Sequence, residues 1–226
     1  MSMHYVDQGK ILSPKQEALL QKEMGQHVRV PTVLGYDHNS ITMIRLPHVL
    51  AGENLAPWII RQLAESLQRV HEAGYVHTDI KRQNLALGYA NELYLMDWNG
   101  ATEIGKQQIT PQFTKHYSAP ELKYQVEVTP QMDMYSLGCI GYKCFGETYK
   151  YPMVPQLDAY VDRGTNNWTN RLAYVRMLRQ CVEILPENRP ETLETFVEIC
   201  STLERPFSLN NVDDGDTIIM SDISYN

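Results

Sequence analysis

The sequence predicts an α+β fold with a small mixed N-terminal part and a larger, mainly helical C-terminal part. The 226 residues are 43% apolar and 21% charged, values typical of a globular chain with a hydrophobic core. Short apolar segments separated by turn residues occupy residues 1–50, which is typical of short strands. From Pro57 onward, long stretches with helical periodicity dominate.

Four elements are expected before residue 50. Residues 13–16 read Ser-Pro-Lys-Gln, a helix start in which Ser caps, Pro fits the first turn and Gln closes a capping box. The predicted elements are a short strand within 1–12, a helix over 13–24 that ends at Gly25, and strands over 28–34 and 40–46.

The C-terminal part opens with an amphipathic helix over 57–74. Its apolar side chains fall on one face and its charged and amide side chains on the other, so it is expected to pack against a core. The elements expected after it are a hairpin of 84–87 and 92–96, a long polar loop over 99–120, and helices over 131–145, 171–185 and 191–203. Long loops in compact domains are usually functional.

Charge and cysteine content exclude several classes of protein. A net charge of −7 argues against a general nucleic-acid binder, because phosphate neutralisation needs clustered Lys and Arg. No apolar stretch reaches membrane-spanning length and no signal peptide is visible, so no membrane partner is expected. The cysteines lack CxxC spacing and are expected to be buried, reduced thiols of a cytoplasmic protein; they are Cys139, Cys144, Cys181 and Cys200.

The most informative segment lies between the long helix and the hairpin, where residues 77–84 read His-Thr-Asp-Ile-Lys-Arg-Gln-Asn. This pattern, H-x-D-x-K-x-x-N, resembles the catalytic loop of protein kinases. Four later segments resemble further kinase motifs in the same order: Asp97-Trp98-Asn99 (D-F-G), 117–121 (Y-x-A-P-E), 133–139 (D-x-x-S-L-G) and 186–190 (the late Arg-Pro motif). Five ordered motifs are far more specific than one, so the chain resembles the protein kinase superfamily over about residues 13–203.

The resemblance implies a kinase-like bilobal organisation of the α+β fold. A reduced N-terminal β lobe would occupy residues 1–50 and carry the helix over 13–24 in the αC position. The mainly helical C-terminal lobe would occupy 51–205. An acidic tail over 206–226, with little periodicity, would follow it.

The resemblance also implies roles in phosphoryl transfer for five residues. Asp79 would orient the attacking hydroxyl and Lys81 would offset charge on the transferring phosphate. Asn84 and Asp97 would supply hard oxygen ligands for Mg²⁺ on the ATP phosphates. Thr114 stands where Ser/Thr kinases place a residue that contacts the catalytic Asp and Lys, which favours a Ser/Thr acceptor.

The expected nucleotide-binding residues come partly from the small N-terminal part. That part contains neither a G-x-G-x-x-G loop nor a V-A-I-K sequence. The residues assigned by resemblance are Glu17 as the αC glutamate, Leu85 and Leu87 under the adenine, and Lys10 as the best stand-in for the phosphate-binding lysine.

Two motif positions depart from the family pattern. Thr78 replaces the Arg of H-R-D, so no cationic pocket calls for a phosphorylated activation loop, and constitutive activity is expected. Asn99 replaces the Gly of D-F-G, and is expected to keep the turn because Asn tolerates left-handed backbone angles.

Other matched positions are expected to be architectural. Glu121 and Arg189 would form a buried ion pair, and Asp133 would accept hydrogen bonds from the catalytic-loop backbone. Of the two histidines nearby, His77 is expected in the core and His71 at the surface.

The sequence favours a minimal ATP- and Mg²⁺-dependent Ser/Thr protein kinase that acts on protein substrates. The missing glycine-rich loop keeps open a second hypothesis, a kinase-like module that binds and inhibits a partner protein. A small-molecule phosphotransferase is the third hypothesis, although those relatives lack Y-x-A-P-E and the Asp133 helix. The oligomeric state is left open.

Overall fold

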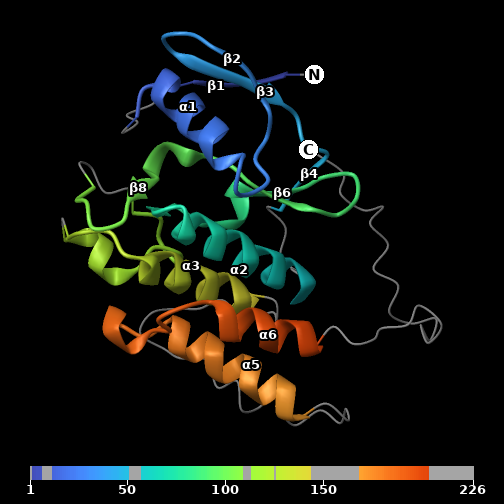
Figure 1. Cartoon of the computed structure of the whole chain (residues 1–226), viewed down its shortest axis with the longest axis vertical. Coiled ribbons are helices and arrows are strands. Elements are labelled where there is room, and N and C mark those ends of the chain that lie inside the picture. Colours follow the sequence, from blue (N-terminus) through green and yellow to red (C-terminus); the bar gives the residue numbers. More distant parts are fainter. Residues whose placement is uncertain are drawn as a thin grey trace.

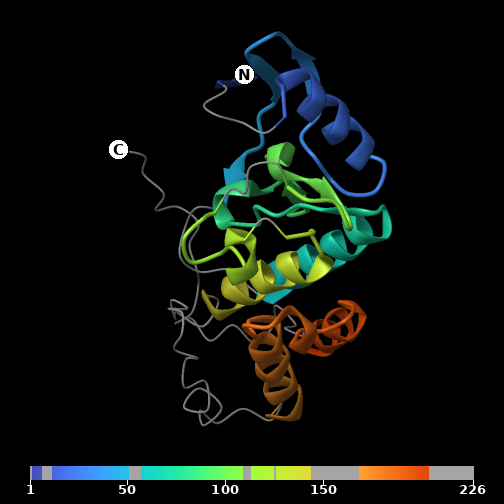
Figure 2. The same cartoon turned by 90° about the vertical axis from the view of Figure 1, so that its left-hand side faces the viewer.

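The computed structural model describes residues 2–6, 12–50, 57–108, 113–124, 126–143 and 168–203. Two connected parts are visible, with an N-terminal sheet and its helix at one end and the helices α5 and α6 at the other (Figures 1 and 2). Three features expected from the sequence lie outside the described residues: Lys10, Cys144 and the acidic tail over 206–226.

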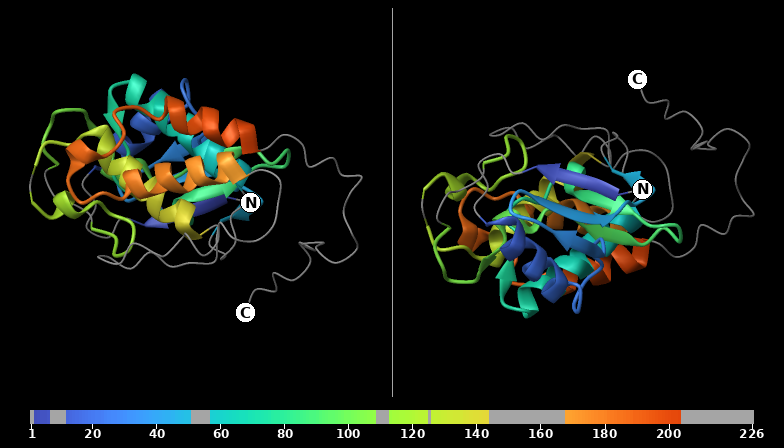
Figure 3. Two further views of the ribbon diagram at one scale, coloured as in Figure 1. Left: turned by 90° about the horizontal axis from the view of Figure 1, so that it is seen from below. Right: turned by 90° about the horizontal axis from the view of Figure 1, so that it is seen from above.

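The N-terminal part is a three-stranded antiparallel sheet with one helix packed against it (Figure 3, right). Its elements are β1 (Ser2–Val6), α1 (Pro14–Met24), β2 (Val33–Tyr36) and β3 (Ser40–Ile44), and the strand order is β1-β3-β2. The capping box is confirmed, since the Ser13 side chain accepts from the Gln16 amide and the Gln16 side chain accepts from the Ser13 amide.

The strand expected over 28–34 begins only at Val33, and the prediction for its start is wrong. Pro31 has no amide hydrogen for a ladder, and its carbonyl accepts from the buried Gln21 side chain. The carbonyl of Arg29 instead accepts from the Leu95 amide at 3.0 Å, which ties this segment to the C-terminal part. Residues 28–32 therefore connect the two parts of the molecule.

The C-terminal part combines helices with short strands. Its elements are β4 (His48–Val49), α2 (Pro57–Glu72), β5 (Tyr75–Val76), β6 (Leu85–Leu87), β7 (Leu93–Leu95), β8 (Thr102–Glu103), α3 (Pro130–Lys143), α5 (Trp168–Cys181) and α6 (Glu194–Leu203). The expected hairpin is confirmed as β6 and β7, which pair antiparallel and are flanked by β4. β5 pairs with β8 and carries the chain into the predicted catalytic loop.

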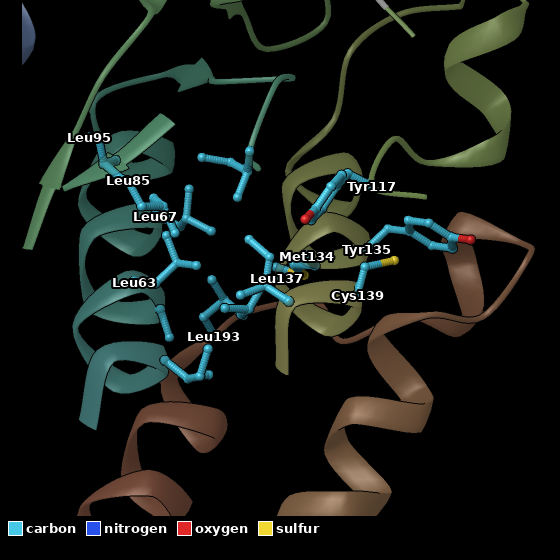
Figure 4. Close-up of a cluster of buried hydrophobic side chains, with 14 of the residues drawn as sticks. Leu63, Leu67, Leu85, Leu95, Tyr117, Met134, Tyr135, Leu137, Cys139 and Leu193 are labelled. Atoms are coloured by element: carbon cyan, nitrogen blue, oxygen red, sulfur yellow. The ribbon is translucent and has the colours of Figure 1, made fainter. Parts of the chain in front are cut away.

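The hydrophobic core lies between α2, α3 and α6 (Figure 4). Leu63 and Leu67 of α2 face Leu137 of α3, and all three side chains are fully buried. Burying one such side chain contributes about 1.5–3 kcal/mol to folding. Val76, Ile80 and Leu85, from the segment that runs from β5 to β6, belong to the same core.

Two glycines let α3 approach α5 closely. A Cβ at Gly138 would lie 2.8 Å from the Cβ of Cys181, and one at Gly141 would collide with the Leu178 side chain. Contacts this short essentially do not occur between carbon atoms, so glycine at these positions sets the helix spacing.

Cys139, Cys181 and Cys200 are buried thiols, as the sequence predicts. Burial raises the pKa of the Cys181 thiol to about 12. Within the described part of the chain, no helix is long and apolar enough to cross a membrane.

Candidate active site

The carboxylate of Asp79 is the centre of the site. It lies in the segment between β5 and β6, and three side chains contact it. Lys81 Nζ lies 2.6 Å from Oδ2, Asn84 Nδ2 lies 3.1 Å from Oδ2, and Thr114 Oγ1 donates to Oδ1 at 2.8 Å. The four residues assigned to catalysis by resemblance therefore meet at one buried carboxylate, although Thr114 is 35 residues from Asp79.

Asn84 is held in one orientation by its amide nitrogen. Nδ2 donates to the Asp79 carbonyl at 2.9 Å as well as to the carboxylate. That arrangement leaves Oδ1 as the side-chain atom able to accept a cation. The Met96 amide donates to the Asn84 carbonyl at 2.9 Å, and Asp97 is the next residue after Met96. The two residues assigned to Mg²⁺ thus stand on adjacent chain segments.

Asp97 has a left-handed backbone, with φ 62° and ψ 75°, and opens a 3-10 turn over Trp98–Gly100. The expectation for Asn99 is wrong in its reason, because the positive φ is at Asp97 and Asn99 lies inside the turn. The Asn99 side chain is buried and its Oδ1 accepts from the Leu12 amide at 2.8 Å. Asn99 therefore connects the turn to the chain just before α1.

Asp133 of α3 accepts hydrogen bonds from the backbone of the catalytic loop. Its two carboxylate oxygens accept from the amides of His77 and Thr78, both at 2.8 Å. Burial alone would raise the pKa of Asp133, but hydrogen bonds from the His71 side chain and the His77 backbone amide hold that pKa below its usual value. The expected backbone-holding geometry is present.

His71 corrects a second expectation. It was expected at the surface, but its side chain is only 10% exposed and its Nε2 lies 3.0 Å from Asp133 Oδ2. His77 is buried as expected, and its ring packs against Trp98 with centroids 4.8 Å apart. His77 Nε2 faces the Met96 carbonyl and Nδ1 faces the Asp79 amide, which fits a neutral ring protonated on Nε2.

Thr78 also has a left-handed backbone, with φ 66°. For a β-branched residue such a conformation is a true outlier and costs about 1–3 kcal/mol. Its hydroxyl donates to the Gly100 carbonyl at 2.9 Å and accepts from Gln108 Nε2 at 2.7 Å. At the position where the family has a cationic side chain, the Thr78 hydroxyl therefore makes hydrogen bonds to uncharged groups.

The structure describes three of the four residues expected to bind nucleotide together with Asp97. Glu17 is buried in α1, and Leu85 and Leu87 are buried in β6 as members of the hydrophobic core. Lys10 lies outside the described residues, so no contact between it and Glu17 is described.

Arg189 and Glu121 form a two-pronged ion pair, as expected. Arg189 Nη1 lies 2.5 Å from Glu121 Oε1, and Nη2 lies 2.8 Å from Oε2. The guanidinium also donates to three carbonyls, those of Glu183, Gln131 and Ile184, at 2.8–3.0 Å. This pair fastens the segment after Thr114 to the helical part.

The profile described as "Protein kinase domain" matches residues 17–201. The chain belongs to the protein kinase family. Among curated relatives of this kinase domain, serine/threonine-protein kinase Nek9 of Xenopus laevis is 28% identical over 163 residues, covering 70% of this chain and 17% of that protein. Serine/threonine-protein kinase chk-2 of Caenorhabditis elegans is 29% identical over 161 residues, covering 63% of this chain and 33% of that protein.

An Aurora kinase of Eremothecium gossypii is 26% identical over 145 residues, covering 57% of this chain and 39% of the relative. The kinase domain thus spans well under half of the length of these relatives. Family membership and the α+β fold are established together, because the matched residues run from α1 to α6.

Three site residues of this kinase domain escaped the sequence reasoning in whole or in part. The burial and contacts of Gln108 were not foreseen, since it lies in a polar loop and its partners are 8 and 30 residues away. His71 could have been found from its position on α2, four residues after the buried Leu67 and so on the same helix face. The hydrogen bond between Asn99 and the Leu12 amide joins residues 87 positions apart, and nothing in the sequence near Asn99 indicates it.

Proposed function

We propose that this chain is an ATP- and Mg²⁺-dependent serine/threonine protein kinase of minimal size. The observation that carries the proposal is the shared carboxylate of Asp79, which has Lys81, Asn84 and Thr114 within hydrogen-bond distance. A buried carboxylate with several fixed donors is suited to orienting a hydroxyl nucleophile.

In the proposed reaction, Asp79 holds the acceptor hydroxyl and receives its proton as the oxygen attacks the γ-phosphorus of ATP. The bond from that phosphorus to the bridging oxygen breaks, and ADP leaves with the bond's electron pair. Lys81 has a side chain that is 22% exposed, so its ammonium can turn from Asp79 toward the transferring phosphoryl group. There it would offset the negative charge that develops in the transition state. Thr114 keeps the Asp79 carboxylate in one orientation through Oδ1.

Asn84 Oδ1 and the Asp97 carboxylate fit Mg²⁺, which prefers hard oxygen ligands and takes few from protein. Within the described residues, no three His, Cys, Asp or Glu side chains gather as a metal site. The remaining ligands would be phosphate oxygens and water, as is usual for this ion. The metal would neutralise charge on the β- and γ-phosphates.

The proposed acceptor class is the hydroxyl of serine or threonine in a protein. Thr114 supports this class, as do the two relatives whose names state serine/threonine activity. Activity without activation-loop phosphorylation is also proposed, because the Thr78 hydroxyl hydrogen-bonds to uncharged groups, the Gly100 carbonyl and the Gln108 amide.

The test is transfer from γ-labelled ATP to a mixture of protein substrates, followed by identification of the labelled amino acids. We expect label on serine and threonine that requires Mg²⁺ and is lost in Asp79→Ala. Labelling that persists unchanged in Asp79→Ala would overturn the assignment.

A second candidate is a kinase-like module that binds and inhibits a partner protein. It is favoured by the absence of a glycine-rich sequence before α1. Thermal unfolding with millimolar Mg·ATP separates the two, since a ligand at a hundred times its Kd adds about 2.7 kcal/mol of stability. An unfolding temperature that does not change would favour the inhibitory module.

A further inference from the structure

We propose that Gln108 is a positioning residue that locks the Asp97 turn in its catalytic arrangement without a phosphate group. The inference rests on the proposed kinase function and deepens it. It assigns a role to a residue outside the family motifs.

A cluster of uncharged hydrogen bonds carries the proposal. Gln108 Nε2 donates to Thr78 Oγ1 at 2.7 Å and to the Gly100 carbonyl at 2.8 Å, and Thr78 Oγ1 donates to the same carbonyl at 2.9 Å. Gln108 is 4% exposed and Thr78 is 3% exposed. These three residues, which we call the Gln108 clamp, join the catalytic loop, the end of the Asp97 turn and the following loop.

The orientation of the Gln108 amide is fixed by chemistry. Both hydrogens of Nε2 are used within the clamp, whereas Oε1 has no partner among the described residues. Exchanging the two atoms would place Oε1 against the Gly100 carbonyl oxygen and lose both donors. Gln108 therefore acts here as a double donor.

Close packing makes the clamp sensitive to small changes. A Cβ at Gly100 would lie 2.8 Å from Thr78 Oγ1 and 3.4 Å from Gln108 Nε2. Thr78 holds a left-handed backbone that a β-branched residue rarely adopts, and such strain persists only where surrounding contacts enforce it. The hydrogen bonds of its hydroxyl are contacts of that kind.

The clamp reaches Asp97 through the turn. Gly100 ends the 3-10 turn whose first flanking residue is Asp97, so a fixed Gly100 carbonyl limits the movement of Asp97. The Asp133 carboxylate holds the Thr78 amide from the other side at 2.8 Å. Misplacing a catalytic group by about 1 Å can cost about a hundredfold in rate.

The test compares wild type, Gln108→Met and the matched control Gln107→Met, whose parent side chain is exposed. Each is treated with phosphatase, and kcat, the KM for a protein substrate and amide hydrogen exchange over 97–108 are measured. We expect Gln108→Met to lower kcat at least about tenfold with KM within twofold. Its amides at 100–103 should exchange at least tenfold faster, and Gln107→Met should match wild type.

Coupling provides a second readout. Because Thr78 and Gln108 act through one cluster, adding Thr78→Val to Gln108→Met should lower kcat by less than a further twofold. The proposal is overturned if Gln108→Met keeps both kcat and exchange within twofold of wild type, or if phosphatase treatment abolishes wild-type transfer. If wild type transfers no phosphate at all, the proposed function fails, while the exchange rates still decide whether Gln108 holds the turn. Unfolding temperatures show whether Gln108→Met folds. If it does not, Gln108→Glu takes its place, because an ionised Glu side chain also lacks the two amide donors.

Discussion

The ion pair between Arg189 and Glu121 allows the sharpest stability prediction, because it has a more exposed counterpart in the same molecule. The Arg189 side chain is fully buried and that of Glu121 is 14% exposed. In the counterpart, which is more open to solvent, Arg61 and Glu65 are 33% and 34% exposed and their closest atoms are 3.5 Å apart. The two substitutions to compare are Glu121→Ala and Glu65→Ala.

The magnitude follows from what each substitution leaves behind. Glu121→Ala leaves a buried guanidinium without its carboxylate, which costs about 3–5 kcal/mol. Glu65→Ala removes a solvated pair and should cost less than about 1 kcal/mol. At about 2–4 °C per kcal/mol for a chain of this size, Glu121→Ala should unfold roughly 6–20 °C below wild type. Arg189→Ala should cost more than Glu121→Ala, because three backbone carbonyls also lose their donor.

Thermal and urea unfolding, followed by circular dichroism at one pH and salt concentration, measure all three variants. The predicted order of destabilisation is Arg189→Ala, then Glu121→Ala, then Glu65→Ala. Equal losses for Glu121→Ala and Glu65→Ala would mean that burial does not make the first pair more costly to break.

Three further predictions concern packing, acid stability and thiol reactivity. Gly138→Ala should lower the free energy of unfolding in urea by about 1–3 kcal/mol, because its Cβ would press on Cys181. The Cβ of Gly35→Ala meets no atom within 4 Å, so that variant should lose less than about 1 kcal/mol. Equal losses for the two variants would contradict this prediction. Because the pKa of Asp133 is lowered in the fold, its ionised carboxylate stabilises the protein above pH 3.8, the usual pKa, and this stabilisation is lost as pH falls through the folded pKa. The difference in free energy of unfolding between wild type and Asp133→Asn should therefore narrow between pH 5 and 3. A difference that widens would oppose the prediction. With a thiol pKa of about 12, Cys181 should resist alkylation by iodoacetamide at pH 7.5 until the protein is unfolded. Alkylated Cys181 found by mass spectrometry in the native protein would contradict this prediction.

Local signals in the sequence were sufficient for several elements. The helix over 13–24 carries its own cap and stop, so its expected bounds agree with α1 to within one residue. The apolar stripe from Ile59 to Val70 identified α2 in the same way, since periodicity is a property of the segment itself.

Elements that depend on distant partners were not predictable from the sequence. The strands β4, β5 and β8 are two residues long and exist because of the strands they pair with. The same holds within the site. Asp79 and Asn84 were found because residues 77–84 resemble the kinase catalytic loop, whereas Gln108 is defined by partners that only the fold brings near.

If Asp79 orients the nucleophile in a working kinase, Asp79→Asn and wild type should differ in one of two measurements made on the same samples. The first is the shift in unfolding temperature with Mg·ATP, and the second is the rate of label transfer to protein serine and threonine. We expect similar shifts for the two proteins and a transfer rate about 10²–10⁴-fold lower in Asp79→Asn. Equal transfer rates for the two proteins, or no transfer by wild type despite a clear shift, would contradict this expectation.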